Sequence, residues 1–166
     1  KEKSNQNVDR KILVDVLHKQ NEFLTLSSLT KENIAALAEQ NTFTITTGHQ
    51  LCLFTGPLYF IYKIVSVLNL VEELKKTYPQ NNFVPVFWMA SEDHDFQEVN
   101  HVNLFGKTLR WQTEQKGPVG RMSLEGLKVV LDELDVILGE GDKASFLSAI
   151  FREAYATHTT LSDATR

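Results

Sequence analysis

The sequence has little cysteine, no excess of positive charge and no long apolar run. Its single cysteine, Cys52, excludes an internal disulfide and suits a reducing compartment. The net charge of −4 argues against a general nucleic-acid binder, because such proteins normally carry a basic stripe. No apolar run reaches the roughly 18 residues that a membrane span needs, and no signal-peptide pattern opens the chain. We therefore expect a cytoplasmic protein that binds neither nucleic acid nor membrane.

What is present is an ordinary globular composition. Hydrophobic residues make up 42% of the chain and charged residues 23%, as in folded soluble domains. The length of 166 residues fits one domain. The last residues begin a new helix, with Ser162 as a candidate N-cap and Asp163 in its first turn. We therefore expect the chain to be a piece of a longer protein.

Apolar patterns predict alternating helices and strands. The segments "FTITTG" and "FVPVFWM" predict two buried strands, and a helix begins between them at about Pro57. This helix is apolar on nearly every side, so most of its surface should be covered. Two strands without polar alternation, joined by a helix, indicate a βαβ crossover with both sheet faces buried. Other predicted elements are helices near 8–21, 31–40 (capped by Thr30), 124–138 and 143–156, and an edge or half-exposed strand at 107–113.

The segment "TTGHQLCLFTGPLYFIYK" follows the first strand and combines glycines with a helix start. Free N–H groups and the dipole at a helix N-terminus favour a bound anion. Tyr59 and Lys63 are four residues apart, so they can share a helix face near that end. A tight turn that needs Gly48 and Gly56 explains the pattern equally well, since it is neither a Walker motif nor G-x-G-x-x-G. The candidate phosphate cradle comprises Gly48, His49, Gln50, Thr55, Gly56, Tyr59 and Lys63.

The segment "SEDHDFQEVNH" follows the second strand, at the edge where open parallel sheets bind ligands. Its carboxylates and imidazoles are groups that act in acid–base catalysis or bind metals. If residues 95–101 are helical, Glu98 and His101 share one face. No tetrahedral zinc spacing appears, and a helix dipole alone would collect acidic residues, so we expect a polar site without metal. The cluster comprises Glu92, Asp93, His94, Asp95, Glu98 and His101.

Two further features carry weaker signals. Arg121 lies in a loop with Gly117, Pro118 and Gly120 and could reach an anion, although a solvated hairpin is the simpler interpretation. Cys52 has no activating base near it in the sequence, and buried structural thiols are the commoner case.

Three motifs occur in order along the chain: T-G-x-Q, then T-G-P-L-Y-x-x-Y-K, then V-P-V-F-W-x-A-S-E-D-H-D-F-x-E-x-N-H. With the later "GPVGRMSL", they resemble the bacterial bacillithiol-synthesis cysteine-adding enzymes, from about Thr44 to the C-terminus. The resemblance implies an α/β fold with a Rossmann-like parallel-sheet core, like that of class I aminoacyl-tRNA synthetases and nucleotidyltransferases. The expected organisation is a helical lead-in at 1–41 and an incomplete nucleotide-binding core, with C-terminal helices, at 42–166.

The resemblance also implies a reaction: a ligase joins L-cysteine to glucosaminyl malate through an amide bond, giving bacillithiol. ATP or ADP is the implied nucleotide, and Mg²⁺ is expected only as an ion bound to that nucleotide. Since family members are several times longer, we expect the chain alone to be inactive. A homodimer is the expected assembly of the full-length protein. The nucleotide contacts implied are Gly48, His49, Gln50, Thr55, Gly56, Tyr59 and Lys63.

Roles for the second segment follow from its position at a strand end. We expect Asp93, His94 and Asp95 to be catalytic, orienting the attacking amine or accepting its proton. Ser91, Glu92 and Arg121 are the expected substrate contacts, and Lys63 or Arg121 would neutralise phosphate. His49 stands where many family members carry a second glutamine, so we expect it to be a contact rather than the catalyst.

Two other interpretations stay open at this point. A metal-dependent hydrolase would use the cluster from Glu92 to His101, and stoichiometric metal in the purified protein would support it. A non-catalytic nucleotide-binding or assembly module would use its helices to contact a partner.

Overall fold

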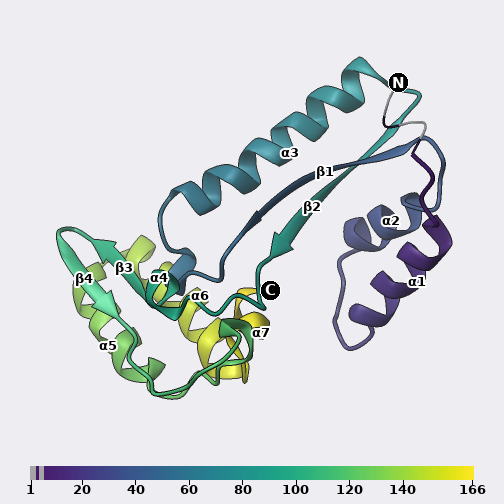
Figure 1. Cartoon of the computed structure of the whole chain (residues 1–166). Coiled ribbons are helices and arrows are strands. Elements are labelled where there is room, and N and C mark those ends of the chain that lie inside the picture. The colour runs from purple at the N-terminus through teal and green to yellow at the C-terminus, as the bar shows by residue number, and fades with distance from the viewer. Residues whose placement is uncertain (1–2, 4–5) are drawn as a thin grey trace. The chain divides into compact units, whose positions relative to one another are not determined.

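The computed structural model describes residue 3 and residues 6–166. Part of the predicted lead-in, residues 1–2 and 4–5, therefore lies outside the described residues. The described elements in chain order (Figure 1) are α1 (Arg10–Gln20), α2 (Ser28–Ala36), β1 (Thr42–His49), the 3₁₀ turn η2 (Leu53–Thr55), α3 (Tyr59–Thr77), β2 (Asn82–Met89), α4 (Phe96–Val99), β3 (His101–Leu104), β4 (Lys107–Arg110), the 3₁₀ turn η3 (Val119–Arg121), α5 (Leu127–Leu138), α6 (Asp142–Thr157) and α7 (Leu161–Thr165).

The chain divides into two compact units. Unit 1 comprises Lys1–Thr47 and Val65–Val86, and unit 2 comprises Gly48–Ile64 and Phe87–Arg166. The division passes through β1, α3 and β2, so each of these elements contributes residues to both units.

Strands β1 and β2 form a two-stranded parallel sheet, and α3 is the crossover between them (Figure 1). Within unit 1, the rings of Phe43 and Phe83 stack with their centroids 6.0 Å apart. Val71 of α3 and Val84 of β2 are buried. The predicted βαβ crossover is therefore confirmed.

The prediction that both sheet faces and most of α3 are buried is wrong. Trp88 of β2 is 59% exposed, and Leu68 and Leu70 of α3 are 45% and 47% exposed. In β1, Thr44 and Thr46 are exposed. The physical reason is that two strands and one helix supply too few layers to cover every apolar side chain.

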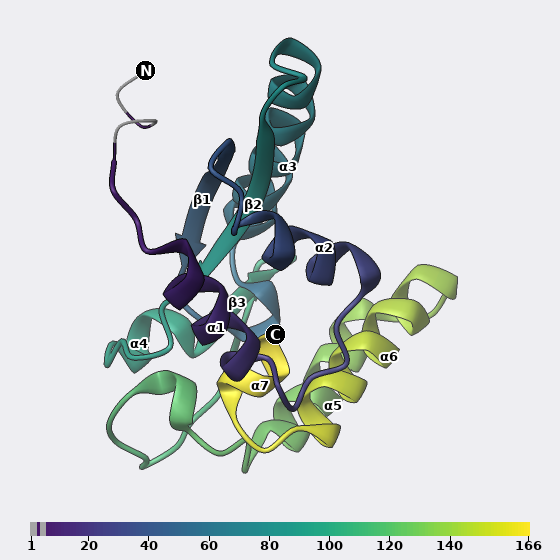
Figure 2. The same cartoon turned by 90° about the vertical axis from the view of Figure 1, so that its right-hand side faces the viewer.

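Helices α1 and α2 precede the sheet in unit 1 and lie side by side (Figure 2). The guanidinium of Arg10 in α1 donates to the carbonyl oxygens of Leu37 and Thr42, at 3.0 and 3.1 Å. Helix α2 begins earlier than predicted, because Ser27 and not Thr30 is its N-cap. The Ser27 hydroxyl accepts a hydrogen bond from the Thr30 N–H at 3.1 Å.

In unit 2, β3 and β4 form an antiparallel hairpin in which Val102 lies opposite Leu109. The prediction of an edge or half-exposed strand at 107–113 is confirmed, although the strand itself ends at Arg110. Leu109 and Trp111 are only 2% and 1% exposed, whereas Arg110 between them is exposed. Trp111 packs edge-on against Phe96, with centroids 5.2 Å apart, and its indole N–H donates to the Glu125 carbonyl at 3.0 Å. The hairpin is therefore part of the unit 2 core.

Two local predictions in unit 2 are corrected. Helix α4 ends at Val99 and His101 begins β3, so Glu98 and His101 do not share a helix face. Helix α7 is capped by Thr160 and not by Ser162: the Thr160 hydroxyl accepts from the Asp163 N–H at 3.2 Å.

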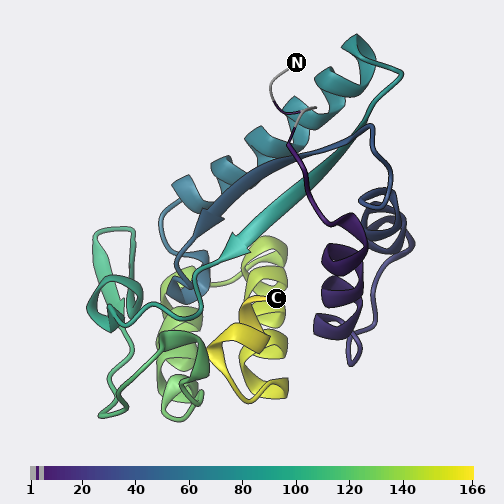
Figure 3. The ribbon, with the colours of Figure 1, turned by 45° about the vertical axis from the view of Figure 1, so that its right-hand side comes forward.

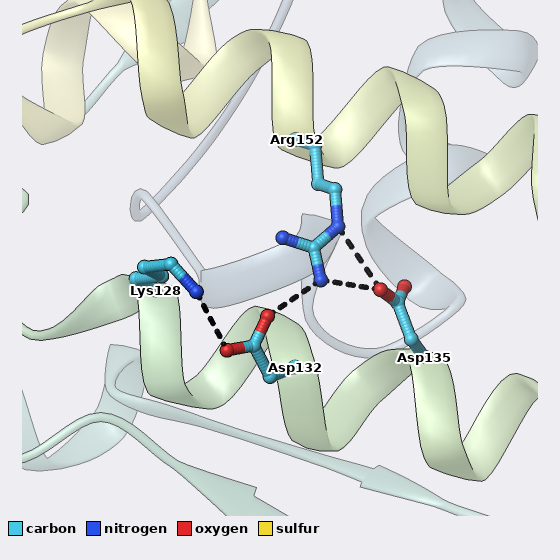
Figure 4. Close-up of polar contacts among 4 residues, drawn as sticks. All are labelled: Lys128, Asp132, Asp135 and Arg152. Carbon is cyan, nitrogen blue, oxygen red and sulfur yellow. Dashed lines mark hydrogen bonds and ion pairs between the residues drawn. The ribbon is translucent and has the colours of Figure 1, made fainter.

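Helices α5 and α6 pack against each other at the C-terminal end of unit 2 (Figure 3). Arg152 of α6 joins them by donating to both Asp132 and Asp135 of α5 (Figure 4), at 2.7 Å to Asp132. Lys128 donates to the same Asp132 carboxylate at 2.9 Å. In the part of the chain that the structure describes, no helix is both long and apolar enough to cross a membrane.

Candidate functional site

The two segments singled out in the sequence meet at Gln50. Its side-chain nitrogen Nε2 donates to Asp93 Oδ2 at 2.7 Å and to Glu98 Oε2 at 2.8 Å. Gln50 directly follows β1, and Asp93 lies in the loop after β2. Because the carboxyl ends of parallel strands lie at one edge of a sheet, the crossover brings these side chains together.

Asp93 is the best-anchored carboxylate of the predicted catalytic group. Hydrogen bonds from the Gln50 amide and then from the Asp95 N–H lower its pKa; the second bond measures 3.2 Å to Oδ1. Both bonds favour the ionised form, so Asp93 carries its negative charge at neutral pH. Such a carboxylate is suited to holding a cation and poorly suited to accepting a proton.

The loop that carries Asp93 is fixed by η3. The Val119 N–H donates to the Asp93 carbonyl at 2.7 Å, and the Gly120 N–H donates to the Ser91 carbonyl at 2.9 Å. A Cβ atom at Gly120 would lie 2.6 Å from Ser91 Cβ, so this contact requires glycine. The prediction of a solvated hairpin here is wrong, since Val119 and Gly120 are buried.

The predicted cradle residues Gly48, Tyr59 and Lys63 also lie together. The Lys63 ammonium donates to the Gly48 carbonyl oxygen and lies 5.2 Å from the centroid of the Tyr59 ring. The expected shared face of Tyr59 and Lys63 is therefore confirmed. Gly48 packs closely against β2, because a Cβ atom there would lie 2.8 Å from the Trp88 carbonyl oxygen.

His49 packs between side chains instead of standing free. Its ring lies edge-on to Tyr59 and Phe60, with centroids 6.0 and 5.5 Å away. Its Nδ1 atom is 3.6 Å from the sulfur of Cys52. Burial, and to a smaller extent the charge of Glu98, raises the pKa of the Cys52 thiol. The predicted buried, unreactive Cys52 is consistent with this protonated state.

A turn of unusual backbone conformation follows Cys52. Phe54 and Thr55 have φ of 50° and 66°, and Gly56 has φ of 55°. Such conformations cost a non-glycine residue on the order of 1–3 kcal/mol and occur often at functional sites. The Phe54 N–H donates to the Tyr155 hydroxyl of α6 at 3.0 Å, and burial raises the pKa of Tyr155 to about 12.

The remaining predicted residues are more exposed. The Ser91 hydroxyl donates to Glu92 at 3.3 Å, and the side chains of His94, Asp95 and Arg121 face solvent. Within residue 3 and residues 6–166, none of these three side chains has a hydrogen-bond partner from the protein. His94 and Asp95 are thus brought beside Asp93 only through their neighbouring positions in the chain.

Unit 2 also contains a cavity of about 670 Å³ that the sequence did not predict. Thr55 and Gly56 of the predicted cradle line it, together with Glu98 and His101. Glu98 and His101 were noticed only as members of the acidic cluster. Part of the wall, Leu134, Leu138, Leu147 and Phe151, comes from α5 and α6, which are too far along the chain for motif spacing to reveal.

The described residues fit neither a nucleotide phosphate nor a metal ion well. Lys63 already donates to Gly48, and the carboxylates of Asp93 and Glu98 would repel phosphate beside Gln50. We therefore derive no step through a nucleotide. In the described part of the chain, no group of three or more His, Cys, Asp or Glu side chains is placed to hold a metal.

Comparison with known proteins gives the family. A family model described as "Bacillithiol biosynthesis BshC, N-terminal Rossmann-like domain" matches residues 1–166, which confirms the predicted Rossmann-like α/β class. The "Putative cysteine ligase BshC" of Flavobacterium johnsoniae is 54% identical over 160 residues, or 96% of this chain and 30% of that protein. Proteins of the same name from Christiangramia forsetii and Cytophaga hutchinsonii are 51% and 46% identical, covering 100% and 99% of this chain.

The chain spans 30% of the Flavobacterium and Cytophaga proteins and 32% of the Christiangramia protein. The match nevertheless extends along the whole of this chain, including the helices before β1. The chain therefore belongs to the family of BshC N-terminal Rossmann-like domains.

Proposed function

We propose that this chain forms part of the active site of a bacillithiol-pathway cysteine ligase, which joins L-cysteine to glucosaminyl malate through an amide bond. The names of the relatives support the ligase. The observation that carries the proposal is the hydrogen bond from Gln50 to Asp93, which joins both motif segments at the carboxyl ends of β1 and β2. Open parallel sheets bind their ligands at this edge.

The chemistry assigns different tasks to the carboxylates. In amide formation the amine nitrogen attacks the cysteine carboxyl carbon and a C–N bond forms. The C–O bond to the activated carboxyl oxygen breaks, this oxygen leaves with its activating group, and the nitrogen loses a proton. Asp93 has a lowered pKa, so it orients the amine by charge and does not accept its proton. His94 or Asp95, both exposed beside Asp93, would receive that proton.

Activation of the carboxyl group requires a co-substrate, and binding of ATP or ADP remains a prediction from the family resemblance. Because Lys63 already donates to Gly48, the exposed Arg121 is the cationic side chain proposed to face phosphate. Titration of the full-length protein with ATP and with ADP checks this prediction, and an absence of saturable binding would contradict it.

The proposal is tested by Asp93→Asn in the full-length protein. Cysteine addition to glucosaminyl malate, followed by mass spectrometry, should fall roughly 10- to 100-fold, because hydrogen bonds to charged groups are worth that much. The control is Asp142→Asn, which removes an exposed carboxylate from the first turn of α6 and should leave the rate unchanged. An undiminished rate in Asp93→Asn would remove this residue from the active site.

A further inference from the structure

The cavity of about 670 Å³ lies wholly within unit 2. Its volume is within the roughly 300–1,000 Å³ that is typical of small-molecule sites. The walls are mainly apolar. Phe54 and Ile61 come from η2 and α3, and Leu134, Leu138 and Phe151 come from α5 and α6. Two residues of the strained turn, Phe54 and Thr55, are among the lining residues. The cavity therefore combines the size of a ligand site with an unusual backbone at its wall.

The charged and ionisable groups of the cavity are Glu98 and His101. One carboxylate oxygen of Glu98 accepts from Gln50 at 2.8 Å, and its other oxygen has no partner among the described residues. Of these described residues, no lysine or arginine lines the cavity. An anionic ligand would therefore meet a carboxylate without a compensating cation.

The hydrogen bonds around His101 define which of its nitrogens is an acceptor. Its Nδ1 atom lies 3.2 Å from the side-chain oxygen of Asn100, which also accepts from Arg110 at 3.0 Å. Arginine is only a donor, so the Asn100 atom that it contacts is the oxygen. Because this oxygen only accepts, the Nδ1 atom of neutral His101 must be the donor and carry the proton. The Nε2 atom of His101 is then an acceptor. Glu98 and His101 together offer acceptors to a ligand that donates hydrogen bonds.

We infer that this cavity binds the amine-bearing end of a ligand, with the Glu98 carboxylate as the partner of a primary ammonium. The identity of this ligand rests on the proposed function and is glucosaminyl malate. The amino-sugar ring lies in the cavity, and the malate carboxylates lie outside it. Gln50 then links two carboxylates, because the amide that holds Glu98 also holds Asp93. Glu98 is a specificity-determining residue in this account, since it distinguishes an ammonium from a neutral amide.

The probes are glucosamine and N-acetylglucosamine, which share a ring but differ in the ammonium. Their binding to the full-length protein is measured by calorimetry near neutral pH, where most of the glucosamine amine is protonated. Wild-type protein should bind glucosamine and should bind N-acetylglucosamine more weakly. Glu98→Gln should weaken glucosamine binding by about tenfold or more, because a charge-assisted hydrogen bond is lost. The control Glu114→Gln, on an exposed loop, should bind as the wild type does.

A second variant tests the location independently of Glu98. Ile61 lines the cavity and is 37% exposed, so Ile61→Trp can fill space there without entering the core. It should also weaken glucosamine binding. Unchanged glucosamine affinity in either Glu98→Gln or Ile61→Trp, or equal affinity of wild type for both sugars, would overturn the inference.

Failure of the cavity assignment can be distinguished from failure of the proposed ligase function. If glucosamine binding depends on Glu98 but the full-length protein adds no cysteine to glucosaminyl malate, the cavity assignment stands and the ligase proposal fails. If cysteine is added but glucosamine binding does not depend on Glu98, the ligase stands and the cavity assignment fails.

Discussion

The side-chain amide of Gln50 lies 2.7 Å from a carboxylate oxygen of Asp93, although the two residues are 43 positions apart. The bond exists because a parallel βαβ crossover brings the carboxyl ends of β1 and β2 to one edge. The same amide nitrogen holds Glu98 at 2.8 Å. Gln50 thus separates two negative charges that would otherwise face each other directly.

Replacing Gln50 by leucine should destabilise the protein in a pH-dependent way. The native pKa of Asp93 is lowered, so its bonds stabilise the fold above the unfolded value of 3.8, and that contribution is lost as the pH falls through the lower native pKa. Gln50→Leu removes the leading cause of the shift and leaves Asp93 facing Glu98. The difference in unfolding free energy between wild type and variant should therefore be largest near neutral pH and shrink in acid. Denaturant titrations across this range measure it, and a pH-independent difference would contradict the assignment.

Replacing Gly120 by alanine should disturb the loop that carries Asp93. The added Cβ would lie 2.5 Å from the Ser162 hydroxyl oxygen and 2.6 Å from both Cβ and the carbonyl oxygen of Ser91. Overpacking of this kind costs typically 1–3 kcal/mol of unfolding free energy. Chemical denaturation should show a loss of this size for Gly120→Ala; a variant that unfolds as the wild type does would mean that close packing is unimportant there.

Tyr155→Phe should loosen the strained turn and change the alkaline limit of stability. The variant leaves the buried Phe54 N–H without its acceptor, at a cost of about 1–3 kcal/mol. Burial raises the pKa of Tyr155 from 10.0 to about 12, so its neutral form stabilises the fold below pH 10 and this contribution is lost as pH rises toward 12. Wild type should lose stability across that interval more steeply than the variant. Tyr62→Phe, at a residue 61% exposed, is the matched control and should unfold as the wild type does.

The sequence predicted the features that depend on local chemistry. β-Branched and apolar runs located β1 and β2, and the glycine- and acid-rich segments after them contained Gln50 and Asp93, which the crossover brings together. Strand β3 was missed because it is only four residues long and directly follows the acidic cluster. The predicted N-caps Thr30 and Ser162 were wrong, because several neighbouring polar residues can serve as caps and the sequence does not distinguish them.

Features that depend on long-range packing were beyond the sequence patterns. Alternation with charged residues correctly predicted a half-exposed strand, but it could not show that Trp111 packs against Phe96. The apolar character of α3 suggested that it is covered, whereas Leu68 and Leu70 are exposed. The cavity likewise required the placement of Leu134 and Phe151 against the turn at Thr55. None of these relationships leaves a fixed spacing in the chain.

The central claim, that the Gln50–Asp93 pair serves cysteine addition, is tested most directly by a double-mutant cycle in the full-length protein. The rate of cysteine addition to glucosaminyl malate is measured for wild type, Gln50→Leu, Asp93→Asn and the double variant. We predict that each single change lowers the rate and that the double variant is little slower than Asp93→Asn, because Gln50 acts through Asp93. Rates that stay at the wild-type level in both single variants, or losses that simply multiply in the double variant, would contradict the claim.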